Sequence, residues 1–261
     1  MATSTIVPAA MFSRHHCSSK ATIPQPQSLQ SVRLEVLTAS SPFSTIREIS
    51  EIIIVALELG TPIWDNIIPS PRAPLEVQIA RVAKQHLMQL KDPKSDKIYV
   101  RAVGVLTSGE ECTVGVAIWQ KPGVRYHTLN LEELSEDDRE GFEGYDMVFR
   151  DAFYGGFQHY RDKLMGDAPY WYLSILAVHP DYQNFKIGSK LLDHGLQHYV
   201  IRGDGRSDTE TRYPTLLEAT PAGERLYKSR GFVKEDEFTL AEQSPGMEKI
   251  RFPLYRKPAD A

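Results

Sequence analysis

The stretch from Tyr170 to Tyr199 constrains the fold of this chain more than any other part of the sequence. Residues 170–178 are apolar apart from Ser174, and such a short apolar run is typical of a strand buried on both faces. Pro180 ends the run, because proline cannot donate to a strand ladder. Apolar residues then recur at helical spacing: Ile187, Leu191, Leu192, Leu196 and Tyr199. The sequence therefore predicts a buried strand, a turn and an amphipathic helix in direct succession.

The turn between this strand and this helix, residues 183–189, is suited to bind an anion. Several backbone N–H groups at the start of a helix have no partner within the helix, and the helix dipole adds positive potential there. A pyrophosphate fits such a place well. Lys186 allows two interpretations: its ammonium pairs with a phosphate, or it points to solvent from an ordinary backbone conformation.

Two motifs resemble a known family. Val178-His179-Pro180-Asp181-Tyr182-Gln183, followed by Lys186-Ile187-Gly188, resembles the cofactor motif of the GNAT superfamily of acyl-CoA-dependent N-acyltransferases, Gln/Arg-x-x-Gly-x-Gly/Ala after a central strand. Lys186 is a departure, since the family usually has its first glycine there. Residues 214–232 resemble the second motif, a strand and a short helix that ends Leu-Tyr-x-x-x-Gly-Phe, here 226–232. Thr220 stands where the family often has Asn. The resemblance covers roughly residues 32–258.

The resemblance implies an acetyl-CoA site between the central strand and the strand that holds Glu218. The pantetheine arm would pair with the central strand, and the N–H of Val178 would stabilise the oxyanion. Gln183 would either contact the cofactor or fix the turn. The residues assigned to acetyl-CoA are Leu176, Ala177, Val178, Gln183, Asn184, Phe185, Lys186, Ile187, Gly188, Ser189, Thr220 and Tyr227.

The resemblance also implies the catalytic residues. Tyr227 would be the general acid that protonates the leaving thiolate; the alternative is a core tyrosine that packs the short helix. Glu218 would be the general base, or it faces away into a structural hydrogen bond. We expect His179 to serve the turn and His127 to be a weaker candidate. A chain of water molecules is a further possibility for the base.

The remaining pattern predicts a mixed α/β protein. We expect a strand at 32–36, a helix from Ser44 or Thr45 to Leu59, a helix at 74–90 and a hairpin of strands 98–106 and 113–120. Beyond the central helix we expect a strand at 214–220, a helix that starts with Pro221, and two strands within 233–257. The resemblance adds a GNAT-like, mostly antiparallel mixed sheet with a splayed centre and helices on both faces. Residues 31–261 would form a single domain behind a flexible tail, 1–30.

The insert at 131–166 begins with acidic residues and then becomes aromatic. We expect Gly155-Gly156 to interrupt any helix there. One interpretation is an acceptor-binding wall whose acidic groups attract a cationic amine. The other is an additional helix packed by its aromatic side chains, with a solvated acidic face. The two do not exclude each other.

Composition narrows the function classes. The net charge is −4 without a basic stripe, so we expect no nucleic-acid partner. No apolar run approaches the ~18 residues of a membrane span, and Cys17 and Cys112 alone make no metal site. We expect a cytoplasmic protein, with a mitochondrial location less favoured because Arg14 and Arg33 are few for a transit peptide, and a monomer or homodimer.

The function that this implies is transfer of an acetyl or other acyl group from acetyl-CoA to a primary amine of a small molecule or peptide, directly within a ternary complex. The alternatives are a non-catalytic acyl-CoA-binding protein, and an O-acyltransferase or acyl-CoA decarboxylase on the same scaffold. The acceptor and the natural acyl group stay open, because a fold does not choose among substrates.

Overall fold

The structure, a computed structural model, describes residues 29–58, 63–69, 71–92, 94, 96–201, 212–239 and 251–259. Nearly all of the expected flexible tail therefore lies outside the described residues, as does Leu59, the predicted end of the first helix. The first strand begins at Leu29, earlier than the Val32 that its alternating pattern suggested.

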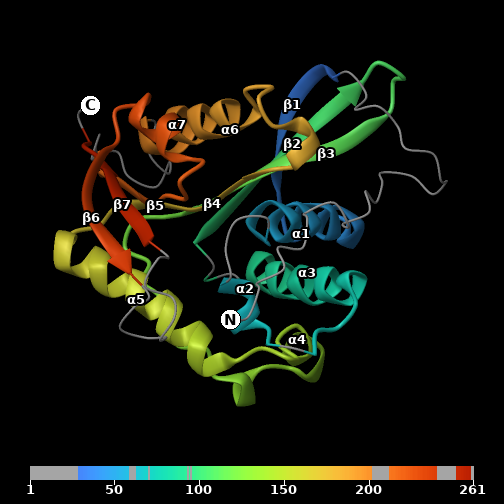
Figure 1. The fold of residues 1–261 in the computed structure, drawn as a ribbon, viewed down its shortest axis with the longest axis horizontal. Coiled ribbons are helices and arrows are strands. Elements are labelled where there is room, and N and C mark those ends of the chain that lie inside the picture. The colour runs from blue at the N-terminus through green and yellow to red at the C-terminus, as the bar shows by residue number, and fades with distance from the viewer. Residues whose placement is uncertain are drawn as a thin grey trace, which may run out of the picture.

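One seven-stranded sheet contains all the strands of the described residues (Figure 1), in the order β1-β2-β3-β4-β5-β7-β6. The strands are β1 (Leu29–Leu37), β2 (Lys97–Leu106), β3 (Glu111–Gln120), β4 (Trp171–Val178), β5 (Thr215–Glu218), β6 (Val233–Thr239) and β7 (Arg251–Lys257). Neighbouring strands are antiparallel except β4 and β5, which are parallel. This confirms the predicted mixed, mostly antiparallel sheet.

Helices cover both faces of the sheet, as predicted. In Figure 1, α6 and α7 lie on one face, and α1, α3 and α5 lie on the other. The helices are α1 (Phe43–Glu58), α2 (Ile63–Ile67), α3 (Leu75–Lys91), α4 (Glu136–Glu140), α5 (Met147–Met165), α6 (Ile187–Gly195) and α7 (Glu224–Lys228), with 3-10 turns η1 (Leu131–Glu133) and η2 (Pro180–Tyr182) and a π-helical turn η3 (Leu196–Ile201). Among the described helices, none combines the length and apolarity needed to cross a bilayer.

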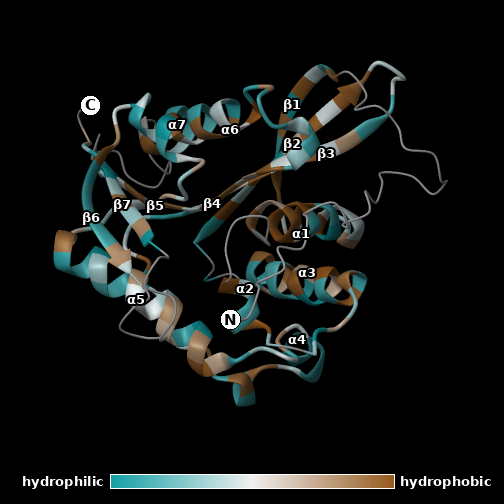
Figure 2. Ribbon diagram, in the orientation of Figure 1, coloured by the Kyte–Doolittle hydropathy of each residue, from teal (hydrophilic) through white to brown (hydrophobic). Residues whose placement is uncertain are grey.

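Two apolar layers hold the helices to the sheet. On one face, Leu191 and Leu192 of α6 pack with Trp119 of β3. On the other, Ile46 and Ile49 of α1 belong to a separate buried cluster. Figure 2 shows α1 largely hydrophobic, whereas α3 also carries hydrophilic residues. Burial of the predicted apolar stripes therefore explains why these segments are helical.

The helix α5 corrects the prediction that Gly155-Gly156 interrupts the insert, because it runs through both glycines. Phe153 and Phe157 flank the pair and are buried, with Phe157 against Phe238 of β6 at a ring distance of 4.9 Å. Burial of each phenylalanine contributes about 1.5–3 kcal/mol, whereas each glycine costs about 1 kcal/mol in a helix. The packing of the aromatic side chains therefore outweighs the low helix propensity.

Two other boundaries also differ from the sequence-based expectation. The short helix α7 begins at Glu224 rather than at Pro221, because Thr220 and Gly223 first close a turn through a 2.9 Å hydrogen bond. The central helix ends at Gly195 and continues as the π-helical turn η3. Both differences lie at element ends, where propensity is the weaker guide.

Candidate active site

The centre of the sheet opens between β4 and β5. Their register has only two pairs, Trp171 with Thr215 and Tyr172 with Leu216. β4 continues beyond them to Val178 without pairing to β5, so the two strands diverge and form what we call the fork. This confirms the predicted splayed centre. It also explains why the second half of β4 is partly exposed, although the apolar run predicted burial on both faces.

Two backbone amides of β4 face the open side of the fork. The N–H of His179 donates to the carbonyl of Val114 on β3 at 3.0 Å, and hydrogen-bonded positions alternate along an antiparallel strand. Val178 and Leu176 occupy the intervening positions, so their N–H groups point away from β3. Ala177, which the sequence analysis also assigned to the cofactor, occupies the position whose backbone faces β3. Two of the three predicted β4 contacts are thus free to pair with an extended ligand.

The turn after β4 is held by side chains that sequence analysis placed there. The imidazole of His179 accepts a hydrogen bond from the N–H of Asp181 at 3.3 Å. The side-chain amide of Gln183 donates to the carbonyl of Val178, also at 3.3 Å. His179 therefore serves the turn, as expected, and Gln183 fixes the turn in this structure. The following residues 183–186 are exposed.

The start of α6 presents unpartnered backbone donors. Lys186 is the N-cap residue, in the left-handed conformation (φ 60°), and makes no side-chain cap. The N–H groups of the first turn, Ile187, Gly188 and Ser189, are thus left without a side-chain acceptor from the cap. Of the two interpretations of Lys186, the ordinary backbone conformation does not hold, because its φ lies in the left-handed region. Asn184 is also left-handed (φ 68°), and Phe185 between them is 50% exposed.

Three elements converge at Gly188. A Cβ placed there would lie 3.5 Å from Leu226 of α7 and 3.7 Å from Val178 at the end of β4. The first turn of α6, the end of β4 and the helix α7 therefore surround one place. An anion at the α6 amides and an extended chain along β4 would meet there, so the residues present fit a diphosphate joined to a linear arm.

Tyr227 follows Leu226 in α7. Its side chain is 7% exposed and packs edge-on against Phe232. Its hydroxyl has no hydrogen-bond partner among the residues that the structure describes. Burial raises the pKa of Tyr227 above the ordinary tyrosine value, so the phenol keeps its proton and can donate it.

Glu218 sits in a buried ion pair at the end of β5. One oxygen accepts from Arg161 of α5 at 2.8 Å and the other from the hydroxyl of Tyr172 at 2.7 Å. Both charged side chains are only 5% exposed, and the guanidinium lies over the Tyr172 ring at 4.0 Å. Burial opposes the charge of Arg161, but Glu218 together with Tyr172 and Tyr170 more than compensates and raises the pKa of the guanidinium. These contacts favour the structural role for Glu218; the general-base role stays a prediction.

Sequence analysis did not identify Arg161 or Tyr172 as site residues. Arg161 is separated from Glu218 by 57 positions, and nothing local distinguishes it from the other basic residues of the insert. An unpaired arginine on the apolar face of a predicted helix would have been the available signal, but Gly155-Gly156 obscured that helix.

The acidic part of the insert does not face the fork. Asp137 and Glu140 both pair with Lys84 of α3, at 2.6 and 2.7 Å, and Glu143 pairs with Arg81. The acidic groups therefore stabilise the packing of the insert on α3, which fits the interpretation of an additional packed helix. His127 is exposed in the loop after β3. The described residues contain no cluster of His, Cys, Asp and Glu placed to hold a metal ion.

One family model matches part of the chain. Residues 147–234, which span α5 to the start of β6, match the model described as an acetyltransferase (GNAT) domain. This segment is therefore similar to a GNAT domain. The matched segment includes β4, α6, β5 and α7, the elements that build the fork and the α6 amides, and the match supports acyl transfer as the general reaction. Sequence comparison with curated proteins gave no significant match.

Solved structures share the GNAT fold at low identity. A protein described as histone acetyltransferase HPA2 and related acetyltransferase, from Corynebacterium glutamicum, is 19% identical, with 87% of this chain and 96% of that chain covered and a TM-score of 0.51. A mosquito arylalkylamine N-acetyltransferase like 5b is 15% identical, with coverages of 87% and 100% and a TM-score of 0.53. Arylalkylamine N-acetyltransferase 2 from Aedes aegypti is 15% identical, with coverages of 88% and 100% and a TM-score of 0.51. At such identities the likeness concerns the fold alone.

Proposed function

We propose that the protein transfers an acetyl group from acetyl-CoA to a primary amine of a small molecule or peptide, by direct transfer in a ternary complex. The observation that carries the proposal is the fork, with two outward-facing β4 amides next to the uncapped start of α6. A thioester with a linear arm and a diphosphate has the shape that these donors would bind.

The arm of acetyl-CoA would lie along β4 and accept hydrogen bonds from the N–H groups of Leu176 and Val178. The diphosphate would accept from the first-turn amides 187–189, with Lys186 and Asn184 shaping the turn. Thr220, partly buried in the turn before α7, would border the arm. In this arrangement the thioester ends near Tyr227.

The chemical step follows from these positions. The neutral amine attacks the thioester carbonyl carbon, and an outward-facing N–H of β4 that the arm leaves free would stabilise the resulting oxyanion. When the carbon–sulfur bond breaks, Tyr227 donates its proton to the thiolate. The products are the amide and free CoA, and the proton lost by the attacking amine passes to water or to Glu218. Since Glu218 is committed to two hydrogen bonds, its larger contribution in this scheme is to hold β5 in place.

A thiol-release assay tests the proposal. We expect acetyl-CoA to yield free thiol only when an amine is present, in a panel of aromatic amines, polyamines and peptides. Alcohols in place of amines test O-acyl transfer, and malonyl-CoA without acceptor tests decarboxylation. Binding of acetyl-CoA without thiol release from any amine would contradict the enzymatic proposal and favour a non-catalytic acyl-CoA-binding protein.

A further inference from the structure

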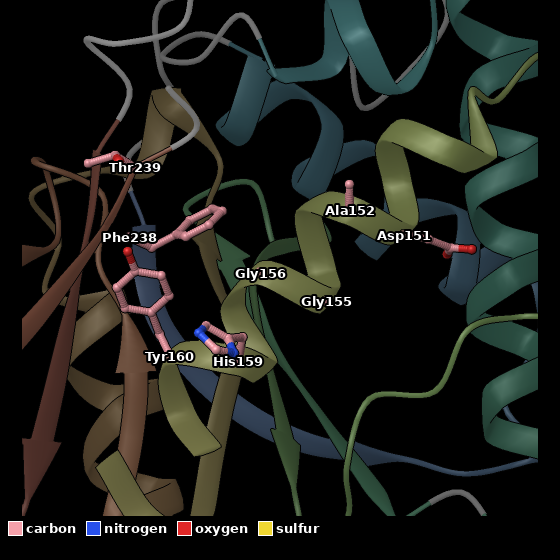
Figure 3. Close-up of a pocket in the computed structure, with 8 residues that line it drawn as sticks. All are labelled: Asp151, Ala152, Gly155, Gly156, His159, Tyr160, Phe238 and Thr239. Carbon is pink, nitrogen blue, oxygen red and sulfur yellow. The ribbon is translucent and has the colours of Figure 1, made fainter. Parts of the chain in front are cut away.

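A cavity of about 290 Å³ lies between α5 and the end of β6 (Figure 3). The residues that line it include Gly155, Gly156, His159, Tyr160, Phe238 and Thr239. Small-molecule sites usually measure about 300–1,000 Å³, so this cavity has room for a single ring or a short chain. It lies beside the insert helix α5 and not beside the turn, residues 183–189, that would hold the diphosphate.

Gly155 keeps this cavity open. A Cβ at this position would meet no described atom within 4 Å, so the packing of the described residues does not require a glycine. Glycine is nevertheless one of the least favourable residues in a helix interior, and here it lies in the middle of α5. Any larger side chain would project into the open space.

The cavity is suited to an uncharged ring. The rings of Tyr160 and Phe238 meet edge-on at a centroid distance of 5.5 Å, which offers an aromatic surface. Asp151 also lines the cavity, but its carboxylate already accepts hydrogen bonds from Tyr126 and Arg150, at 2.6 and 2.8 Å. In Figure 3 the Asp151 side chain points away from Phe238. Its charge is therefore compensated and leaves little to attract an ammonium group.

Tyr160 connects the cavity to the closed end of the fork. Tyr160 packs against a cluster that contains Leu216 of β5, and Tyr172 of β4 packs on the same cluster. Tyr172 and Leu216 form the last pair before the strands diverge. Tyr160 thus lines the cavity and also packs at the closed end of the fork.

We propose that this cavity binds the uncharged, ring-bearing end of the acyl acceptor, whose amine then extends towards the fork. The inference rests on the proposed function and names its substrate class: a primary amine separated by a short linker from one ring. The insert helix, through the absence of a side chain at position 155, would then select the acceptor.

The test fills the cavity without removing any contact. Gly155→Leu and Gly155→Ala place a side chain in the open space and improve helix propensity. Val148→Leu is the matched control, since Val148 lies on the same helix and is 84% exposed. The probes are 2-phenylethylamine, its neutral analogue 2-phenylethanol, and 1,4-diaminobutane, which lacks a ring. Calorimetry gives the affinity of each probe, and thiol release gives KM.

We expect the wild-type protein to bind both ring-bearing probes, and Gly155→Leu to weaken both at least tenfold without lowering Tm. Gly155→Ala should have a smaller effect, and Val148→Leu none. KM for 2-phenylethylamine should rise in parallel with Kd, with KM for acetyl-CoA unchanged. Ring-bearing probes that do not bind the wild-type protein, or that bind Gly155→Leu equally well, would overturn the inference. Loss of acetyl-CoA binding or turnover in the wild type would instead refute the proposed function, and binding of 2-phenylethanol still reports on the cavity.

Discussion

Among the buried tyrosines, Tyr227 differs in the state of its hydroxyl. The hydroxyls of Tyr99 and Tyr255 donate to Gln89 and Glu224 at 2.6 and 2.8 Å, as is usual for buried phenols. The hydroxyl of Tyr227 has no such partner in the described part of the chain. This hydroxyl is therefore available to donate to a ligand.

Tyr227→Phe is therefore expected to lower kcat about 10²-fold or more, the range of general acid catalysis, with little change in the affinity for CoA. Tyr99→Phe is the control, because it removes a buried hydroxyl away from the fork and should lower stability rather than rate. Stopped-flow or steady-state thiol release and calorimetry with CoA give the two quantities. An unchanged kcat would remove Tyr227 from the mechanism.

The raised pKa of Tyr227 sets a pH dependence with a definite sign. The phenol acts in its protonated form, so loss of the proton would lower kcat as pH rises. Because burial moves this pKa upward, the decline should begin above the ordinary tyrosine value of about 10. A decline of kcat with a midpoint near pH 8 in the wild type, absent from Tyr227→Phe, would contradict this assignment.

The buried ion pair of Glu218 and Arg161 predicts how substitution of either residue changes the stability of the protein. Removal of one partner leaves the other charge buried, so we expect Glu218→Leu or Arg161→Met to destabilise the protein by about 3–5 kcal/mol. The double variant Arg161→Met/Glu218→Leu should recover much of this loss, because a buried ion pair is often replaceable by apolar groups. Urea unfolding of the four proteins completes the double-mutant cycle.

The same variants separate the two roles of Glu218. If Glu218 has a structural role, the folded double variant should retain the kcat of the wild type. If Glu218 is the general base, kcat should fall in both variants that lack the carboxylate. Additive destabilisation in the cycle would show that the ion pair does not act as a unit.

For helices and strands, the periodicity of apolar residues was sufficient to predict the element where one face of the segment is buried. It located α1, α3 and the β2–β3 hairpin to within a few residues, because each presents a regular apolar stripe to the sheet. It did not predict a continuous α5, because the helix depends on contacts of Phe153 and Phe157 with strands far along the chain. The ion pair of Arg161 was not predicted for the same reason, since local sequence patterns do not identify a partner far along the chain.

The turn that precedes α6 yields a test at the level of an element. Lys186→Gly and Asn184→Gly both relieve a left-handed backbone position, which costs a non-glycine residue about 1 kcal/mol. Both variants should therefore be slightly more stable than the wild type. Only Lys186→Gly removes a charge, so it should weaken CoA binding several-fold, and less so at high salt.

Differential scanning calorimetry and CoA titrations at two salt concentrations measure both effects, and Asn184→Gly is the matched control. Equal CoA affinity in the two variants would mean that the ammonium of Lys186 points to solvent and makes no contact with the ligand.

For the whole molecule, a buried histidine predicts how stability depends on pH. His86 of α3 contacts the hydroxyl of Tyr99 at 3.0 Å, and burial, assisted by the charge of Lys97, lowers the pKa of His86 to about 3. The folded protein keeps His86 neutral, whereas the unfolded chain binds a proton below pH ~6.5. Stability contributed by His86 is therefore complete above pH ~6.5 and falls as the pH decreases, by about 1.4 kcal/mol per pH unit.

Urea unfolding at pH 7, 6 and 5 should show this slope in the wild type and a flatter one in His86→Gln, which retains a polar group towards Tyr99. Parallel slopes in the two proteins would mean that other groups control the acid sensitivity.

The position of Arg161 has a consequence for how such a protein could change its specificity. One side chain from an inserted helix touches both arms of the opening in the sheet, and the same helix forms the wall of the cavity. Mutations that reposition this helix would alter the proposed acceptor cavity and the width of the fork at once. Under the proposed function, acceptor preference and donor binding would thus be coupled, and a graft of the insert into a related scaffold would have to carry Tyr172 and Glu218 with it.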